Sequence, residues 1–365
     1  MKILLVQDYL RSGGTERQTL LLARGFAAAG HAVTLLTFRP GGRVASALPC
    51  PRLALQPCDL QLDWFAPGLT RTAAAANPDI ILCMGRMANC YAGRLQARVP
   101  GAAVVATLRT GKHLPWLFRR SLRRVRHIVA NSAEASALQQ ARLGLPAERI
   151  SVIRNALVFP ARSTDPHHRI LRGQYGAGPA TTVLLCVAMF RPEKNQRELV
   201  EIVAGLPAGL DWQLWLAGDG PSRAAGAALV QARGLTDRVK FLGYHADATA
   251  LYGEADIAVH ASTTESLSNF IIEAQAHGLP AVAARAQGMS ECLVPERTGW
   301  VIAPGDRPAF RSALVRLIAE GPAARGRRGE EARAFAAAAF DPARQVAAYL
   351  KLFSRLRAPS FERKI

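Results

Sequence analysis

The chain alternates between short apolar runs and longer amphipathic segments, beginning with its first 160 residues. An apolar run of about four to eight residues bounded by turn residues is typical of a buried strand, whereas apolar residues three and four apart are typical of a helix. Residues 15–30 have the helical spacing and follow the first run. The expected strands of this half are KILLV, HAVTLLTF, PDIILCMG, AAVVATLR, RHIVANS and ISVIRNA.

The same alternation restarts after a change of composition. Residues 161–182 are rich in Pro, Gly and His, which indicates a domain linker. The expected strands beyond it are TVLLCVAMF, DWQLWLAGDGP, VKFLGY, ADIAVHA, LPAVAA and GWVIAP. We expect helices at Gln196–Ala204 and Asn269–Ala276, and a final helical segment that breaks near Asp341-Pro342.

Strands that alternate with helices predict parallel sheets covered on both faces. At 365 residues the chain has the length of about two domains. The sequence therefore predicts an α/β protein made of two doubly wound halves. Ligands of such folds bind at the carboxyl ends of the strands, so a cleft between the halves is the expected site.

Charge is unevenly distributed along the chain. The formal net charge is +19; residues 1–160 hold 21 Lys and Arg against 7 Asp and Glu, whereas residues 161–365 hold 25 against 20. A basic excess confined to the first half indicates an anionic partner there, either a membrane surface, an acidic substrate or nucleic acid.

The cysteines and the N-terminal run indicate a cytosolic protein. The six cysteines form no CxxC pair and no cluster with histidine, which favours reduced thiols over a zinc site. The first apolar run is broken by Gln7 and Asp8, so we expect a strand there and not a signal peptide. No window approaches the roughly 18 apolar residues of a membrane span.

Three loops carry candidate chemistry for binding an anion. Gly13-Gly14, between the first strand and helix, lets backbone amides approach an anion, although a plain tight turn explains it equally well. It is not the three-glycine dinucleotide fingerprint, which argues against a dehydrogenase. Arg191 and Lys194 suit a diphosphate, but by themselves they are better interpreted as a solvated charged loop. For AGDGP at 217–221, simple turn chemistry is the favoured interpretation.

The stretch TTESLSNFIIEAQAHGLP at 263–280 places two glutamates eight positions apart. Glu265 falls in the loop after a strand, and Glu273 falls in the second turn of a helix capped by Ser268-Asn269. The helix start between them is suited to a phosphate, and the carboxylates are suited to sugar hydroxyls. By spacing alone, a surface loop glutamate and a solvated helical glutamate are the better interpretation.

Taken together, these motifs resemble the retaining glycosyltransferases of family 4, which have the GT-B fold and use nucleotide-diphosphate sugars. The resemblance covers nearly the whole chain in the right order and is most specific in the second half. It is carried by GGTE, ANS, IRNA, RPEKN, AGDGP, VKFLGY, ESLSNFIIEAQAHGLPAVA and TGWVIAPGD.

The resemblance implies roles for single residues. Glu265 would lie by the transferred sugar, Glu273 would bind the ribose hydroxyls, and Lys194 would bind the diphosphate. The family's remaining donor and nucleotide contacts fall on loop and helix-start positions, here Ser268, Asn269, Phe270, Gly13, Gly14, Gly243 and Tyr244.

The sequence departs from the family pattern at three places. Met189 stands where the family usually has an arginine, and Arg191 is the candidate substitute. Where a histidine often follows the VVAT strand, this chain has Arg109, with His113 four residues later, and either could replace it. The family's Pro-Asn-Gly turn is Arg-Asn-Ala at 154–156. We therefore count Arg191 and Arg109 with Glu265 and Lys194 as the expected catalytic residues.

The chemistry requires cations near the leaving group. Breaking the anomeric C–O bond releases a diphosphate, whose growing charge Arg191, Lys194 and a helix N-terminus can neutralise. The resemblance implies that no metal and no bound cofactor is needed, and a UDP-sugar is the expected co-substrate. It also implies that the leaving phosphate helps to deprotonate the acceptor.

The segment 109–127 carries seven basic residues, no acid, and interleaved Trp, Phe and Leu. A basic amphipathic helix with aromatic residues is suited to an anionic membrane surface, as a lipid-linked acceptor would require. The alternatives are a solvated helix whose apolar side packs on the core, and nucleic-acid binding, which lacks a recognition module here.

The resulting hypothesis is a retaining glycosyltransferase of bacterial cell-surface polysaccharide or glycolipid assembly, cytoplasmic or peripheral on the inner face of the cytoplasmic membrane. The expected domains are 1–165 with a returning helix at about 343–365, on the acceptor side, and 166–342, which binds the nucleotide sugar. The alternatives are a GT-B-like nucleotide-sugar epimerase or hydrolase, and an inactive basic protein that binds a membrane or an anion.

Overall fold

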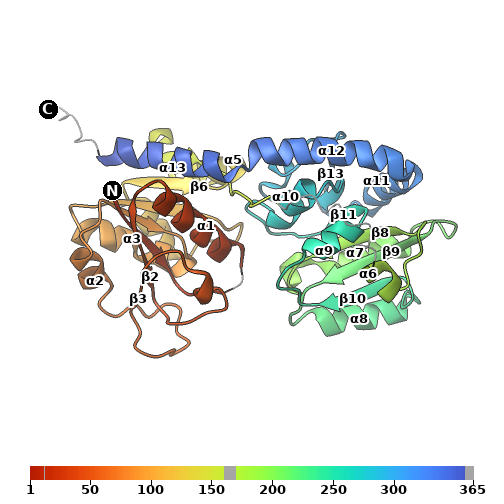
Figure 1. Cartoon of the computed structure of the whole chain (residues 1–365), viewed down its shortest axis with the longest axis horizontal. Helices are drawn as coiled ribbons and strands as arrows, with labels where there is room; N and C mark the ends of the chain where they lie inside the picture. The colour runs from red at the N-terminus through yellow and green to blue at the C-terminus, as the bar shows by residue number, and fades with distance from the viewer. Residues whose placement is uncertain (12, 160–169, 358–365) are drawn as a thin grey trace. The chain divides into compact units, whose positions relative to one another are not determined.

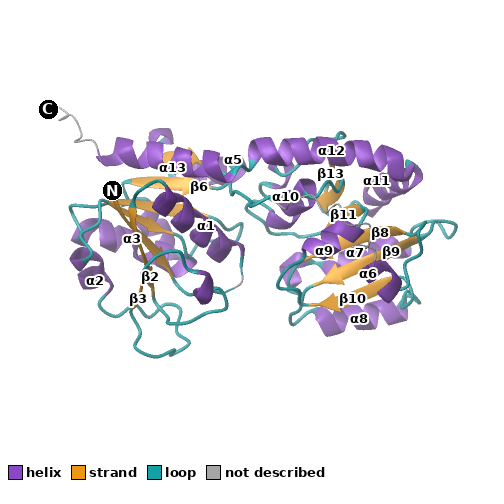
Figure 2. Ribbon diagram, in the orientation of Figure 1, coloured by secondary structure: helices purple, strands orange, loops and turns teal. Residues whose placement is uncertain are grey.

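The computed structural model describes residues 1–11, 13–159 and 170–357, and these form two compact units. One unit is Met1–Ala156 together with Asp341–Ile365, and the other is Leu157–Phe340. Each has a sheet with helices on both faces (Figure 1, Figure 2). The predicted pair of doubly wound α/β halves is therefore confirmed.

The first unit has a seven-stranded parallel sheet in the order β3-β2-β1-β4-β5-β6-β7. Leu5 of β1, an inner strand, pairs with Leu35 on one side and Leu82 on the other. The apolar runs predict every strand except the three-residue β3. The strands are β1 (Lys2–Gln7), β2 (Ala32–Thr37), β3 (Arg52–Ala54), β4 (Ile80–Cys83), β5 (Ala103–Leu108), β6 (His127–Ala130) and β7 (Ile150–Val152).

Both faces of this sheet are buried, as alternate residues of β1 show. Ile3 and Leu5 face one core, whereas Leu4 and Val6 face the other. The first core is covered by α1 (Gly14–Ala28) and α13 (Pro342–Arg357), and the second by α2 (Leu69–Ala75), α3 (Arg86–Arg98), α4 (Trp116–Leu122) and α5 (Ala133–Leu143).

The last described helix, α13, packs on α1 of the first unit. The rings of Tyr349 and Phe353 lie 6.1 and 5.5 Å from that of Phe26. Beside them the Gln345 side-chain amide donates to Gln18 Oε1 at 3.0 Å. Helix α13 is thus part of the first unit's core.

The second unit has a six-stranded parallel sheet in the order β10-β9-β8-β11-β12-β13. The strand order reverses between β8 and β11, which is where doubly wound folds bind ligands. The strands are β8 (Thr182–Val187), β9 (Trp212–Ala217), β10 (Val239–Gly243), β11 (Ile257–His260), β12 (Ala281–Ala284) and β13 (Gly299–Ile302).

The helices of this unit also divide between two cores. The main ones on one face are α7 (Gln196–Ala204), α8 (Arg223–Ala232) and α11 (Arg307–Ala319), and those on the other are α9 (Thr249–Glu254), α10 (Asn269–Ala276) and α12 (Gly321–Ala339). α7 and α10 have the predicted bounds. The predicted break near Asp341-Pro342 is also confirmed, because α12 ends at Ala339 and α13 begins at Pro342.

The expected linker at 161–182 is wrong over its second part, while its first part lies outside the described residues. Residues from Ile170 form α6 (Ile170–Gln174), and the Arg172 side chain is buried. Its guanidinium pairs with Asp256 at 2.5 Å and donates to the Glu254 carbonyl oxygen at 2.9 Å. A Gly- and Pro-rich composition does not reveal partners more than eighty residues away.

Asp8 directly follows β1 and lies at the N-terminus of α3. The strand order of the first unit reverses here, between β1 and β4. Its carboxylate accepts hydrogen bonds from the Met87 and Ala88 amides at 2.9 and 2.5 Å, in the first turn of α3. Burial raises the pKa of this carboxyl to about 7, and it outweighs those two hydrogen bonds, which lower it. The native state therefore holds the Asp8 proton more tightly than the unfolded chain does.

We predict that Asp8 makes the protein less stable as the pH rises from about 4 to about 7. A raised pKa contributes stability that is complete below the unfolded value and is lost through the folded value. The melting temperature of the protein minus that of Asp8→Asn should fall across this window and level off above it. A difference that is constant between pH 4 and 8 would contradict the prediction.

Candidate active site

The loops that follow β8 and β11 are tied together at the carboxyl edge of the second unit's sheet. The Thr263 amide and the Ser262 hydroxyl both donate to the Glu193 carbonyl oxygen, at 2.9 and 3.0 Å. The helices that continue from the two loops, α7 and α10, pack on opposite faces. A crevice between such loops is the expected ligand site of this topology.

Lys194 ends the 3-10 turn Pro192–Lys194 in the first of these loops. The following residue, Asn195, has φ +52°, a left-handed conformation that asparagine tolerates better than most residues. The Lys194 ammonium contacts Glu265 Oε1 at 2.5 Å. An ammonium has three N–H donors, so it can hold this carboxylate and a phosphate at once.

Glu265 is a buried carboxylate with two donors on the same oxygen. Its side chain is 10 % exposed, and Oε1 accepts from Lys194 and from His260 Nε2, the latter at 2.8 Å. Burial by itself would raise its pKa, but the His260 hydrogen bond and the Lys194 charge outweigh it and lower the pKa to about 2. Because both contacts of this described residue fall on Oε1, Oε2 is left for a ligand.

His260, the last residue of β11, is a site residue that the sequence analysis missed. An ionised carboxylate only accepts hydrogen bonds, so Nε2 carries the proton toward Glu265. Its other nitrogen, Nδ1, lies 3.9 Å from the Cys186 sulfur of β8. The available signal was a lone polar residue at the end of the apolar run ADIAVHA.

The N-terminus of α10 lies between the two glutamates in the chain. The Ser268 hydroxyl caps the helix by accepting from the Ile271 amide at 3.5 Å. The amides of Ser268, Asn269 and Phe270 are at the positive end of the helix dipole, where an anion is stabilised. The structure thus has the helix start that the sequence predicts next to Glu265.

Glu273 lies one turn into α10 and is held by Tyr252 of α9, a second missed residue. The Tyr252 hydroxyl donates to Glu273 Oε2 at 2.7 Å. The Tyr252 ring is itself fixed by stacking on His277 at 4.6 Å and on Phe270 at 6.2 Å. Glu273 is four residues after Asn269, so both are on one side of α10.

The AGDGP turn at 217–221 packs against the backbone of the loop that carries Lys194. Gly218 has φ +135°, and a Cβ atom there would lie 2.0 Å from the Ala188 carbonyl oxygen. Gly220 has φ +148° and approaches the Phe190 carbonyl oxygen in the same way. The favoured interpretation of AGDGP as turn chemistry is in keeping with this contact, because only glycine fits there.

Three further expected residues of this unit, Arg191, Gly243 and Tyr244, lie at strand ends. Arg191 and Met189 are exposed in the loop after β8, and Tyr244 is exposed after β10. Gly243, which ends β10, has φ +73° and open space where a side chain would be. All of them are at the carboxyl edge that carries Lys194 and Glu265, and their roles stay predictions.

In the first unit, Arg109 has structural partners. Its guanidinium donates to Asn155 Oδ1 at 2.5 Å and to the Tyr349 hydroxyl at 3.0 Å, which ties the 153–156 segment to α13. His113 is exposed, and its carbonyl oxygen accepts from Arg86 at 3.1 Å. Which of the two, if either, takes the place of the family histidine stays open.

Gly13 and Gly14 are at the start of α1, with Gly13 as its N-cap. A Cβ atom on Gly13 would lie 2.5 Å from Glu16 Oε2, so a carboxylate of the same helix folds back on this residue. Their contact with donor phosphates stays a prediction.

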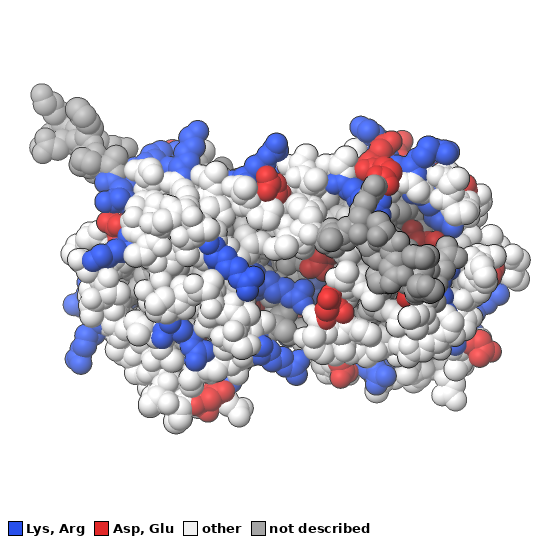
Figure 3. Space-filling view, viewed as in Figure 1, with Lys and Arg blue, Asp and Glu red and all other residues white. Residues whose placement is uncertain are grey.

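The basic segment around α4 is only partly packed. Phe118, Leu122 and Val125 are buried in the core, as expected for a solvated helix whose apolar side packs on the core. Trp116 and Leu117, however, are 59 and 51 % exposed. Figure 3 shows basic side chains scattered over the face in view. The segment therefore has an apolar as well as a basic surface.

Two classes of feature are not found in the described part of the chain. Within residues 1–11, 13–159 and 170–357, no group of three His, Cys, Asp or Glu side chains could hold a metal ion. Over the same residues, every helix is too short or too polar to span a membrane.

Family models match both units. The model described as Glycosyltransferase Family 4 matches residues 12–157, and the model described as glycosyl transferases group 1 matches residues 181–320. Alpha-D-kanosaminyltransferase of Streptomyces kanamyceticus is 27 % identical over 279 residues, which are 71 % of this chain and 72 % of that protein.

Other relatives match over a shorter stretch. The lipopolysaccharide core biosynthesis glycosyltransferase LpsE of Rhizobium meliloti is 31 % identical over 138 residues, which span 38 % of this chain and 40 % of that protein. Among solved structures, Anabaena Alr3699/HepE in complex with UDP has a TM-score of 0.82 at 24 % identity, covering 97 % of this chain and 100 % of that chain. The likeness in structure shows the GT-B fold, and the two family models, which together match most of the chain, show that it belongs to glycosyltransferase family 4.

Proposed function

We propose that this glycosyltransferase moves a sugar from a UDP-sugar to a glycan or lipid-linked acceptor with retention of anomeric configuration. The observation that carries the proposal is the Lys194–Glu265 contact beside the start of α10, at the strand reversal of the second unit. An ammonium, a helix start and a carboxylate with one open oxygen are the groups that a diphosphate and a sugar hydroxyl require.

The donor would lie along α10. Its diphosphate would accept from Lys194 and from the amides of Ser268, Asn269 and Phe270, with exposed Arg191 as a second cation. Glu273, already oriented by Tyr252, would accept from the ribose hydroxyls. Glu265 Oε2 would accept from a hydroxyl of the transferred sugar.

In the transfer step, the bond between the anomeric carbon and the β-phosphate oxygen breaks and UDP leaves with the electron pair. The acceptor oxygen bonds to the anomeric carbon on the face that UDP vacates, and its proton passes to a phosphate oxygen. Lys194 and the helix start stabilise the charge that grows on the diphosphate. None of these groups has to act as a strong base.

The choice of UDP and of a cell-surface product rests on the relatives. HepE was solved with UDP, and LpsE carries the name of lipopolysaccharide core biosynthesis. The kanosaminyltransferase, by its name, transfers a kanosaminyl group. We place the enzyme in the cytoplasm, on the inner face of the membrane.

The membrane contact would be made by the 109–127 segment. Its exposed Trp116 and Leu117 could enter the headgroup region while the arginines around them contact anionic lipid.

We predict that UDP-sugars raise the melting temperature more than GDP-, ADP- or dTDP-sugars, because binding stabilises the native state.

Glu273→Ala should weaken UDP binding about 10-fold or more, since hydrogen bonds to a charged acceptor contribute roughly 1.5–3 kcal/mol. Glu331→Ala is the control, because its ion pair with Arg297 is exposed. Equal shifts with all four nucleotides, or an unaffected Glu273→Ala, would contradict the assignment.

Lys194→Ala should lower turnover on the order of 10²-fold, because it removes the positive charge that stabilises the leaving diphosphate.

His260→Phe should lower kcat about 10-fold or more because Glu265 is no longer held in place. His260→Gln should retain activity because its amide can still donate to Glu265. Without His260 the pKa of Glu265 rises, so the acid limb of the kcat profile should move to higher pH in His260→Phe.

A product assay that separates glycosylated acceptor from free sugar checks these variants and distinguishes transfer from epimerisation or hydrolysis. Wild-type turnover in Lys194→Ala would rule out its role. An identical loss in His260→Gln and His260→Phe would show that the histidine does not act by donating to Glu265.

The membrane proposal predicts that the protein sediments with phosphatidylglycerol liposomes and that Arg120→Glu/Arg124→Glu does not. Arg24→Glu/Lys351→Glu is the matched control, because α1 and α13 cover the other face of the same sheet. Equal sedimentation of both double variants would refute binding through α4.

A further inference from the structure

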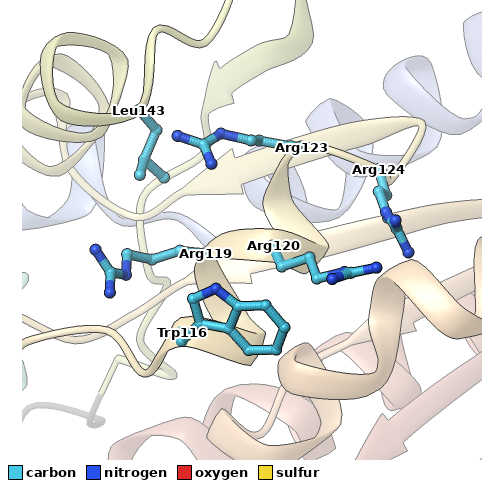
Figure 4. Close-up of a pocket in the computed structure, with 6 residues that line it drawn as sticks. All are labelled: Trp116, Arg119, Arg120, Arg123, Arg124 and Leu143. Carbon is cyan, nitrogen blue, oxygen red and sulfur yellow. The ribbon is translucent and has the colours of Figure 1, made fainter.

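A pocket of about 400 Å³ lies on the outer side of α4 in the first unit (Figure 4). Four arginines, one tryptophan and one leucine line it, and no acidic side chain does; the lining residues are Trp116, Arg119, Arg120, Arg123, Arg124 and Leu143. The pocket is separate from the donor site, which lies in the other unit.

The helical repeat explains why these four arginines lie on one side of the helix, although Figure 4 shows that their guanidinium groups point in different directions. Positions three, four, seven and eight residues after Trp116 lie on the same side of a helix and its continuation. The opposite side carries Phe118 and Leu122, which are buried in the core. Core packing of α4 therefore forces the basic side outward.

In the part of the chain that the structure describes, the four arginines that line the pocket donate no hydrogen bonds to the backbone of this region. Arg149 donates to the carbonyl oxygens of Leu122 and Val125, at 3.3 and 2.5 Å, and so satisfies the end of α4. Among the described residues, no hydrogen bond or ion pair joins a protein group to the guanidinium of any of the four lining arginines. The Arg120 guanidinium lies over the Trp116 ring, 5.2 Å from its centroid.

Arg119 is half-buried in the lining of the pocket. Its Nε atom is buried without a hydrogen-bond partner. Its terminal nitrogens, by contrast, are not buried in this way and can donate to a ligand in the pocket. Figure 4 shows the Arg120 and Arg124 guanidinium groups on the right of the view and those of Arg119 and Arg123 on the left, and an anion bound beside these charges would be stabilised by them.

The residues that line the pocket indicate which class of anion it would bind. Guanidinium groups bind phosphate oxygens through paired N–H donors, and several of them favour a group that carries two or more negative charges. Trp116 and Leu143 offer an apolar surface to the carbon part of the same molecule. A carboxylate or a single phosphodiester would leave most of these donors unused.

We infer that this pocket binds a phosphomonoester or diphosphate group of the acceptor and so anchors the acceptor on the first unit. The inference rests on the proposed function, because it treats the occupant as the acceptor. The pocket is an anchoring site and not a part of the reacting centre.

The first experiment is a calorimetric titration of the full chain with inorganic pyrophosphate in the presence of saturating UDP, which fills the donor site. One pyrophosphate should bind per chain, at least about 10-fold more weakly in Arg120→Gln/Arg124→Gln, while the control Arg24→Gln/Lys351→Gln keeps its affinity. Arg119→Lys/Arg123→Lys, which keeps charge but removes the paired donors, should also bind more weakly.

Absence of saturable pyrophosphate binding, or equal affinity in the pocket and control variants, would overturn the inference. The Lys194→Ala variant separates this outcome from failure of the donor site, because it should lose UDP binding and keep the pocket's pyrophosphate.

The second experiment identifies the source of the phosphate. Phosphatidylcholine vesicles with phosphatidic acid are compared with vesicles that carry phosphatidylglycerol at matched surface charge. A preference for phosphatidic acid that pyrophosphate and the Arg120→Gln/Arg124→Gln exchange both remove assigns the pocket to a lipid headgroup. Pyrophosphate binding without such a preference assigns it to a soluble phosphorylated glycan.

Discussion

The ion pair between Lys194 and Glu265 is the contact on which the candidate site depends. A carboxylate that is nearly withdrawn from water needs partners, and Glu265 has two on one oxygen, the Lys194 ammonium and the His260 ring. Removing either would leave a buried charge short of a partner. The loops after β8 and β11 are therefore held at one separation, which the hydrogen bonds to Glu193 also maintain.

The two units have similar sheets but use their strand reversals differently. In the first unit Asp8 occupies the start of α3, so the chain's own carboxylate takes the place of an anion there. In the second unit the start of α10 is capped by the neutral Ser268 hydroxyl, and the acid beside it is bound to Lys194. One helix start is thus filled and the other is suited to a ligand.

Apolar periodicity predicted every strand except β3, but not α6, and contacts between distant residues were not predictable. α7 and α10 have the bounds that their helical spacing indicates, because the local pattern decides them, with the Ser268 cap added at α10. Arg172 contradicts the expected linker because its partners, near 254–256, come close only in the folded unit.

The candidate site shows the same division between local and tertiary information. The sequence indicated Lys194, Glu265 and Glu273 by motif, and the structure adds the groups that orient them. His260 and Tyr252 were missed because a polar residue at a strand end and a tyrosine in a short helix carry no local signal of a partner. A crystal structure of the protein with UDP tests the central claim directly: the diphosphate should contact Lys194 and the α10 amides, and density elsewhere would contradict it.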